Sequence, residues 1–205
     1  MVVVVLHEHD WAIDDAVRSY EERLSLAKLD NISFHGKDLL HGNEDYESVS
    51  IGDRKRLLTQ FARLARMLPY RYFVLRYNRD DVHGQYELEA KLRRDLASVV
   101  FERLSFFQQF DSVSVYYDGG QKTVSIALHD ALDFVLARNV ADFREADHSA
   151  RRLLQVADYI CTIERAMEGF DKGTQSNTQV RFFGSRRKLY QSYLKQISQK
   201  QFLLP

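Results

Sequence analysis

The sequence has very little cysteine and proline. A single cysteine, Cys161, excludes an internal disulfide framework and a cysteine-rich zinc site. The two prolines are Pro69 and Pro205, and no Ser/Gly-rich stretch, repeat or low-complexity tract divides the 205 residues. We therefore expect a single domain over 1–205, with 178–205 as a basic helical extension packed on it.

Long apolar runs are also missing. No stretch approaches the roughly 18 consecutive apolar residues that cross a bilayer. The opening run Val2–Leu6 is short for a signal peptide and follows no basic residue. We expect a cytoplasmic protein that uses no membrane.

Neither sign of charge is in excess. Lys plus Arg and Asp plus Glu both number 29, which excludes a globally basic coat but leaves local patches open. The hydrophobic share of 45% and the charged share of 28% are typical of a folded chain rather than a disordered one.

The hydrophobic pattern alternates between helical and strand spacing. This alternation predicts an α/β fold whose strands are joined by crossover helices. An aperiodic, glycine- and histidine-containing stretch over 31–43 predicts a loop. The predicted strands are 2–6, 70–77, 112–117 and 140–143, and the predicted helices are 12–29, 51–68, 86–107, 124–138, 149–167 and 186–200.

Asp118 follows the best predicted strand directly and precedes two glycines. In α/β proteins, ligand sites gather outside the carboxyl ends of the strands, so this position favours a functional carboxylate. The alternative is an ordinary Asp-Gly turn.

Asp158 lies at the rim of the apolar arc of helix 149–167, with Gln155 and Thr162 as its polar neighbours. Packing would hold a carboxylate there while it faces a cleft; the alternative is the beginning of a solvated face. If Asp118 and Asp158 converge, they form an oxygen-rich site suited to Mg²⁺ or Mn²⁺. Phosphodiester cleavage uses such metals to activate water and neutralise charge.

The histidines are weaker signals. The stretch from His7 to Asp10 directly follows a strand and lacks the helical i, i+4 pair of a zincin, so we interpret it as a polar strand end rather than a metal site. His35 lies in the aperiodic loop, where functional side chains often occur.

The C-terminal segment is basic. From Gln179 onward there are six basic residues and no acidic one, and aromatic residues are interleaved with them. Helix 51–68 also carries a basic outer face. This pattern suits a phosphate backbone with stacked bases, and it equally suits an amphipathic helix that docks its aromatics into the core. The candidate nucleic-acid-binding residues are Arg181, Arg186, Arg187 and Lys188.

Several short motifs, taken in order along the chain, resemble the domain of unknown function 3800 family. They are Phe34–Leu39, Glu44–Tyr46, Val113–Gln121, Phe143–Ser149, Leu153–Thr162, Arg181–Ser185 and Tyr193–Lys195. The family is similar to ribonuclease H-like folds and is expected to contain metal-dependent nucleases, often carried on bacterial and phage-borne DNA.

The resemblance implies a ribonuclease H-like mixed sheet flanked by helices, with Mg²⁺ or Mn²⁺ as cofactor and a nucleic acid as partner. Asp118 and Asp158 are the implied metal ligands. Gln121, Gln155 and His35 are the implied site-lining residues, and Glu44 is a further acidic contributor.

One departure from the family concerns its first strand, which carries Asp-Glu-Ser-Gly and supplies a metal-binding aspartate. Nothing here matches it, so either the true start lies upstream or the chain is a truncated relative. Because this strand is central, its loss would open a gap in the sheet and favour pairing between copies as a homo-oligomer.

Three hypotheses follow. The leading one is a divalent-metal-dependent nuclease-type hydrolase, inactive if the first acidic strand is truly absent. The others are a non-catalytic nucleic-acid-binding or interaction module and a nonfunctional fragment of a larger reading frame.

Overall fold

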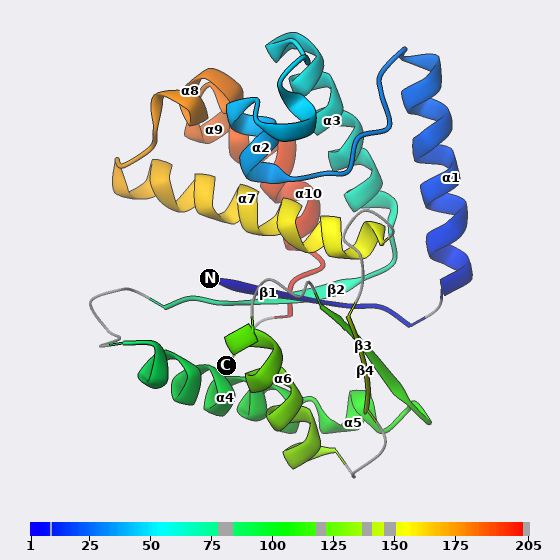
Figure 1. Ribbon diagram of the computed structural model, residues 1–205, viewed down its shortest axis with the longest axis vertical. Helices are drawn as coiled ribbons and strands as arrows, with labels where there is room; N and C mark the ends of the chain where they lie inside the picture. The colour runs from blue at the N-terminus through cyan, green and yellow to red at the C-terminus, as the bar shows by residue number, and fades with distance from the viewer. Residues whose placement is uncertain (9, 78–83, 118–121, 137–140, 146–150, 203–205) are drawn as a thin grey trace. The chain divides into compact units, whose positions relative to one another are not determined.

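A computed structural model describes residues 1–8, 10–77, 84–117, 122–136, 141–145 and 151–202 (Figure 1). The chain is mixed α/β and forms two compact units. The first, here called unit 1, is built mainly from Val74–Leu154. The second, unit 2, is built mainly from Val3–Phe73 and Gln155–Leu203.

Unit 2 is mostly helical. Local sequence sets both ends of helix α3. The Ser50 side chain caps its beginning by accepting a hydrogen bond from the Asp53 backbone N–H, and Pro69 prevents the helix from continuing past its last turn. The elements that lie wholly or mostly in this unit are β1 (Val2–Leu6), α1 (Asp10–Leu26), α2 (Gly36–His41), η1 (Glu44–Tyr46), α3 (Ile51–Met67), β2 (Arg71–Leu75), α7 (Arg152–Lys172), α8 (Asn177–Phe183), α9 (Arg186–Leu189), the π-helical turn η3 (Tyr190–Leu194) and α10 (Lys195–Ser198).

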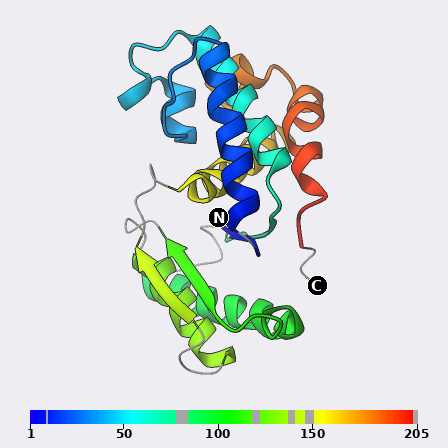
Figure 2. The ribbon, with the colours of Figure 1, turned by 90° about the vertical axis from the view of Figure 1, so that its right-hand side faces the viewer.

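Unit 1 holds two strands and the helices around them. Strands β3 (Val113–Tyr117) and β4 (Ala141–Glu145) pair in parallel, with Val115 opposite Phe143, and α6 (Lys122–Val135) connects them. This is the crossover that the alternating pattern predicted. Helix α6 packs against α4 (Gln85–Glu102), and both lie on one face of the strand pair (Figure 2); the short helix α5 (Leu104–Phe107) follows α4.

The strands of the described residues form two separate two-stranded sheets, β1–β2 and β3–β4. The C-terminal segment also attaches to β2. The Tyr72 N–H donates to the Lys200 carbonyl at 3.0 Å, and the Phe202 N–H donates to the Tyr72 carbonyl at 2.7 Å. Strand β2 therefore has β1 as one hydrogen-bonded neighbour and residues 200–202 as another.

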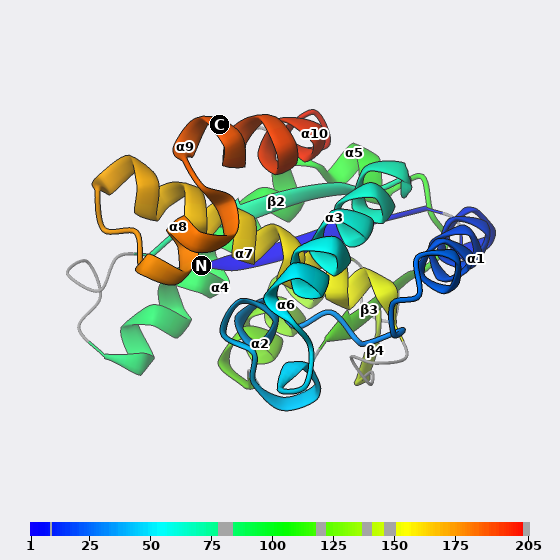
Figure 3. The same ribbon diagram turned by 90° about the horizontal axis from the view of Figure 1, so that it is seen from above.

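The core of unit 2 contains a cluster of aromatic rings among aliphatic side chains. The rings of Phe34 and Phe61 stack with centroids 4.3 Å apart, and Tyr159 meets both edge-on or tilted at 5.7 Å. These rings come from the 31–43 stretch, α3 and α7, and Figure 3 shows α3 and α7 crossing. Residues distant in the sequence are thus locked together by packing.

The prediction of a continuous loop over 31–43 is wrong, because this stretch contains α2. The helix is only six residues long and ends at Gly42, whose φ of 76° is the left-handed C-cap conformation. A helix this short gives no readable periodicity. Helix α8 was not predicted either, although Ser176 and Gln179 form a capping box at its start.

No helix of the described residues has both the length and the apolar character needed to cross a membrane.

Candidate functional site

Gln155 connects α7 to the 31–43 stretch through both ends of its side-chain amide. Its Oε1 accepts a hydrogen bond from the Phe34 N–H at 3.1 Å, and its Nε2 donates to Ser33 Oγ at 2.9 Å. The side chain is fully buried. A buried amide must find partners for its polar atoms, so Gln155 both satisfies itself and anchors this loop.

Asp158 binds the same loop one helical turn further along α7. Its Oδ2 accepts a hydrogen bond from the Gly36 N–H at 2.9 Å, while Thr162 Oγ1 lies 3.5 Å from Oδ1. The carboxylate is half-buried, and it faces the beginning of α2. One carboxylate oxygen therefore accepts from a backbone amide, and the other makes only a long contact among the described residues.

Gly36 makes this approach possible. A Cβ atom at this position would lie 1.8 Å from Thr162 Oγ1, far inside van der Waals contact. Because glycine has no such atom, the loop backbone can lie directly against α7.

His35 is the residue between these two anchors. Phe34 on one side is held by Gln155, and Gly36 on the other is held by Asp158. The His35 side chain is half-buried. The structure therefore brings three sequence-predicted site residues, His35, Gln155 and Asp158, to one place. We call the backbone Ser33–Gly36 together with Gln155 and Asp158 the loop–α7 site.

The turn η1 is attached to the same loop by Tyr46. Its hydroxyl donates to the Ser33 carbonyl at 2.9 Å. Burial raises the pKa of Tyr46, and the nearby Asp158 charge raises it further, so the phenol stays protonated as a donor. Glu44 begins this turn with a φ of 49° and is exposed.

Tyr46, Thr162 and Gly36 were not predicted as site residues. The i, i+4 spacing of Asp158 and Thr162 on a helix was a usable signal, because such residues lie on the same face.

Two predicted residues, Asp118 and Gln121, lie outside the described residues, as does His9. The convergence of Asp118 with Asp158 therefore stays a prediction.

The donor atoms of the described residues do not by themselves make a Mg²⁺ site. Mg²⁺ needs near-octahedral oxygen coordination and takes one or two protein carboxylates. Within the described ranges, no group of three or more His, Cys, Asp or Glu side chains is placed to hold a metal ion. At the loop–α7 site the structure supplies one carboxylate, that of Asp158, whose Oδ1 makes only a 3.5 Å contact with Thr162 among the described residues.

In the basic C-terminal segment, the aromatic side chains differ in how deeply they are buried. The side chains of Phe182 and Phe183 are 7% and 3% exposed, and Phe183 packs on Tyr193 with ring centroids 5.7 Å apart. Of the interleaved aromatics, Tyr190 is the most exposed, at 41%. Of the two arrangements that the sequence left open, Phe182 and Phe183 have the one in which aromatic side chains dock into the core.

The four basic candidates in this segment are all exposed but differ in charge pairing. Arg186 forms an ion pair with Asp171 of α7. Arg181, Arg187 and Lys188 form no ion pair with any other described residue. Within the described part of the chain, no carboxylate therefore competes with an incoming anion for these three cations.

No family model, curated protein or solved structure matches this chain. The resemblance described above rests on the motifs alone.

Proposed function

We propose that this protein is a nuclease-type hydrolase acting on phosphodiester bonds, with its site at the loop–α7 contact. One observation carries the proposal: neighbouring backbone amides of one loop are hydrogen-bonded to Gln155 and Asp158, with His35 between them. This arrangement holds the His35 backbone between two anchors on α7, one of which is the Asp158 carboxylate.

The chemistry of these groups suits phosphodiester hydrolysis. A histidine can accept or donate a proton near neutral pH, and a positioned acid or base contributes about 10²–10⁴-fold in rate. The hydrogen bonds to Gln155 and Asp158 keep the His35 backbone in place, which limits the entropy lost when a substrate is oriented.

The proposed cofactor is Mg²⁺ or Mn²⁺, with Asp118 and Asp158 as ligands, Glu44 as a further acidic group and Gln121 lining the site. When bound, such an ion would supply charge neutralisation at the scissile phosphate. Asp158 suits this role because Oδ1 keeps lone pairs beyond its 3.5 Å contact with Thr162.

The finer fold assignment, a ribonuclease H-like sheet, belongs to the same proposal. Its support is the parallel β3–α6–β4 unit, whose first strand ends at Tyr117, directly before Asp118. A carboxylate at the end of a parallel strand is where α/β enzymes place ligand-binding groups.

The test is cleavage of labelled single- and double-stranded DNA and RNA with Mg²⁺, with Mn²⁺ and with chelator. The variant Asp118→Asn/Asp158→Asn is expected to lose about 10²-fold or more of the rate. Asparagine at position 158 can still accept the Gly36 hydrogen bond, so the loop is expected to keep its place.

The matched control is Asp171→Asn, which makes the same substitution on the exposed part of the same helix, where Asp171 pairs with Arg186. It is expected to cleave like the wild type. Cleavage that survives the double substitution defeats the assignment.

A second candidate is a non-catalytic nucleic-acid-binding module. The observation in its favour is that Arg181, Arg187 and Lys188 are exposed without ion pairs in the described part of the chain. Salt-dependent binding without metal-dependent turnover would select this function over hydrolysis.

A further inference from the structure

Two cations of α3 lie over one buried ring of α8. The guanidinium carbon of Arg54 is 5.5 Å from the centroid of the Phe182 ring, and the ammonium nitrogen of Lys55 is 5.9 Å from it. Arg181 directly precedes Phe182 in the chain and is exposed. Burial lowers the pKa of Arg54, and the charge of Arg181 lowers it further. We call Arg54, Lys55 and Arg181 the basic cluster.

Arg54 is held in a fixed position within this cluster. Its Nη1 donates to the carbonyls of Leu39 and Leu40, at 2.8 and 3.1 Å, near the end of α2. A Cβ atom on Gly42 would lie 3.0 Å from the same nitrogen. The Arg54 Nε is buried and has no hydrogen-bond partner in the described part of the chain. The cluster is thus built around a preorganised guanidinium rather than a mobile surface side chain.

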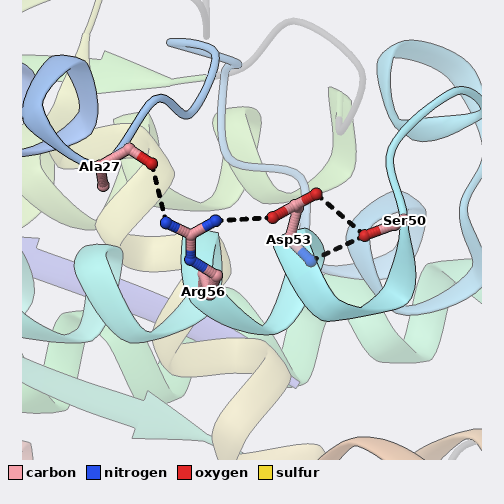
Figure 4. A network of polar contacts seen from close by, with 4 residues as sticks. All are labelled: Ala27, Ser50, Asp53 and Arg56. Atoms are coloured by element: carbon pink, nitrogen blue, oxygen red, sulfur yellow. Dashed lines mark hydrogen bonds and ion pairs between the residues drawn. The ribbon is translucent and has the colours of Figure 1, made fainter.

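No carboxylate neutralises these charges within the described residues. Asp53 is adjacent in sequence to Arg54, but its carboxylate accepts hydrogen bonds from Arg56 at 2.8 Å and from Ser50 at 2.9 Å. Figure 4 shows this closed network, in which Arg56 also donates to the Ala27 carbonyl. The carboxylate of Asp53 is therefore paired with Arg56 and Ser50 rather than with the basic cluster.

We propose that Arg54, Lys55 and Arg181 bind a phosphate group of a nucleic-acid backbone, an inference that rests on the proposed action on phosphodiesters. Like charges gathered without a counterion raise the free energy of the free protein, and a bound anion relieves this repulsion. The exposed guanidinium of Arg181 can match phosphate oxygens through paired hydrogen bonds, Lys55 adds a point charge, and the fixed Arg54 adds its positive charge.

The burial of the aromatic rings defines what this site can recognise. Phe182 is 7% exposed and Phe183 is 3% exposed, so neither offers a face on which a base could stack. Contacts to phosphates position a nucleic acid without reading its sequence. We therefore expect binding with little dependence on base sequence and a strong dependence on salt.

The experiment measures binding of the full chain to a short fluorescein-labelled duplex by fluorescence anisotropy over a series of salt concentrations. The variant Lys55→Gln/Arg181→Gln leaves the structural Arg54 in place. Its Kd is expected to rise about tenfold. The slope of log Kd against log salt is expected to fall by about 0.9 for each phosphate that the variant no longer neutralises.

Two further variants separate charge from fold. Lys28→Gln removes one positive charge from an exposed residue in the turn after α1 and is expected to leave both Kd and slope unchanged. Lys55→Gln/Arg181→Lys restores one charge and is expected to recover part of the affinity. Thermal melting of each variant checks that it remains folded.

Equal affinity and equal salt slope in the wild type and in Lys55→Gln/Arg181→Gln overturn the inference, as does a wild type that shows no salt-dependent binding. Complete displacement of the duplex by inorganic phosphate at equal phosphate concentration assigns the site to free phosphate and overturns the nucleic-acid ligand.

The binding series is run with chelator present, so that it reports binding of the duplex without metal-dependent cleavage. Failure of the cleavage proposal with intact, cluster-dependent binding therefore leaves this inference standing, and the two outcomes are separate.

Discussion

The loop–α7 site and the basic cluster belong to the same unit but differ in how their polar side chains are paired. At the loop–α7 site, the amide of Gln155 and the carboxylate of Asp158 each receive a backbone N–H of the loop. In the basic cluster, Arg54 meets two carbonyls, and no acidic side chain of the described residues pairs with Arg54, Lys55 or Arg181.

This difference separates two tasks. A network of hydrogen bonds that is partly or wholly buried favours one geometry, because breaking a buried hydrogen bond leaves an unpaired group in a low dielectric. A group of unpaired cations at the surface does the reverse: it leaves binding energy available for an anion. The first arrangement suits a positioned reaction site and the second suits attachment of a substrate.

The largest change in unfolding free energy is expected at Phe182, the ring over which Arg54 and Lys55 lie. Phe182→Ala removes a ring that is 7% exposed and should destabilise the protein by about 3–5 kcal/mol, as for other buried phenylalanines. Tyr190→Ala is the control, since Tyr190 is 41% exposed, and it should cost less than about 1 kcal/mol.

Urea unfolding of both variants decides between a core ring and a base-stacking ring. Near-wild-type stability of Phe182→Ala, combined with a loss of nucleic-acid binding, would mean that this ring serves a ligand rather than the core.

A smaller loss is expected at the loop–α7 site. Gly36→Ala places a Cβ where Thr162 Oγ1 lies 1.8 Å away, so the loop must move off the helix. We expect a loss of about 2–3 kcal/mol in unfolding free energy, in the range for overpacked sites. Adding Thr162→Ala removes the nearest clashing atom and should recover part of the loss.

Gly52→Ala serves as the comparison, because the nearest atom to its added Cβ is Ser50 Oγ at 3.6 Å. As a Gly-to-Ala change in helix α3, it should leave stability unchanged or raise it by up to about 1 kcal/mol. Equal effects of the two substitutions in chemical denaturation would contradict the close approach at Gly36.

The smallest change in stability is expected from Lys200. This cation is hydrogen-bonded like the groups of the loop–α7 site but, like the basic cluster, has carbonyls rather than a carboxylate as its partners among the described residues. Its Nζ donates to the Arg66 carbonyl at 2.7 Å and to the Ala65 and Leu68 carbonyls, and it lies 4.4 Å from the Tyr70 ring centroid. Burial lowers the pKa of Lys200 from 10.5 to about 8.

Since the unfolded chain then binds more protons than the folded one between about pH 8 and 10, stability should rise over this window. The gain should stay under about 1 kcal/mol, because water screens a half-exposed ammonium. Above about pH 10 the sign reverses. Burial raises the pKa values of Tyr46, Tyr70 and Tyr159 above their ordinary 10.0, so the unfolded state loses protons first.

Thermal melts at several pH values test this sign, and Lys200→Met should abolish the rise between about pH 8 and 10. A wild type whose stability falls steadily from about pH 8 would show that the three carbonyls hold the ammonium protonated despite its burial.

Local patterns were sufficient for most of the long elements. The apolar stripe of 51–68 and the stop at Pro69 predicted α3 to within one residue, and the alternation over 112–117 predicted β3. The stretch over 31–43 was misread because α2 is shorter than two helical turns, and its boundaries depend on Gly36 and Gly42.

The candidate site was predictable only in part. His35, Gln155 and Asp158 were chosen from their place in a loop, from the rim of a helical arc and from motif resemblance. That Gln155 binds the backbone of Phe34 could not be inferred from any of these, because the pairing joins residues 121 positions apart. The sequence was equally compatible with aromatic rings that stack on bases and with rings that pack into the core. For Phe182 and Phe183, their burial in the structure selects packing into the core.

Composition and periodicity alone established a mixed α/β chain with its principal helices and strands, since hydrophobic spacing acts over a few residues. Which polar groups meet depended on long-range packing: α7 receives the 31–43 stretch because Gly36 carries no Cβ, and Phe182 turns inward beneath Arg54 and Lys55. These partnerships require the folded backbone, because the free energy of a buried hydrogen bond or ring depends on what surrounds it.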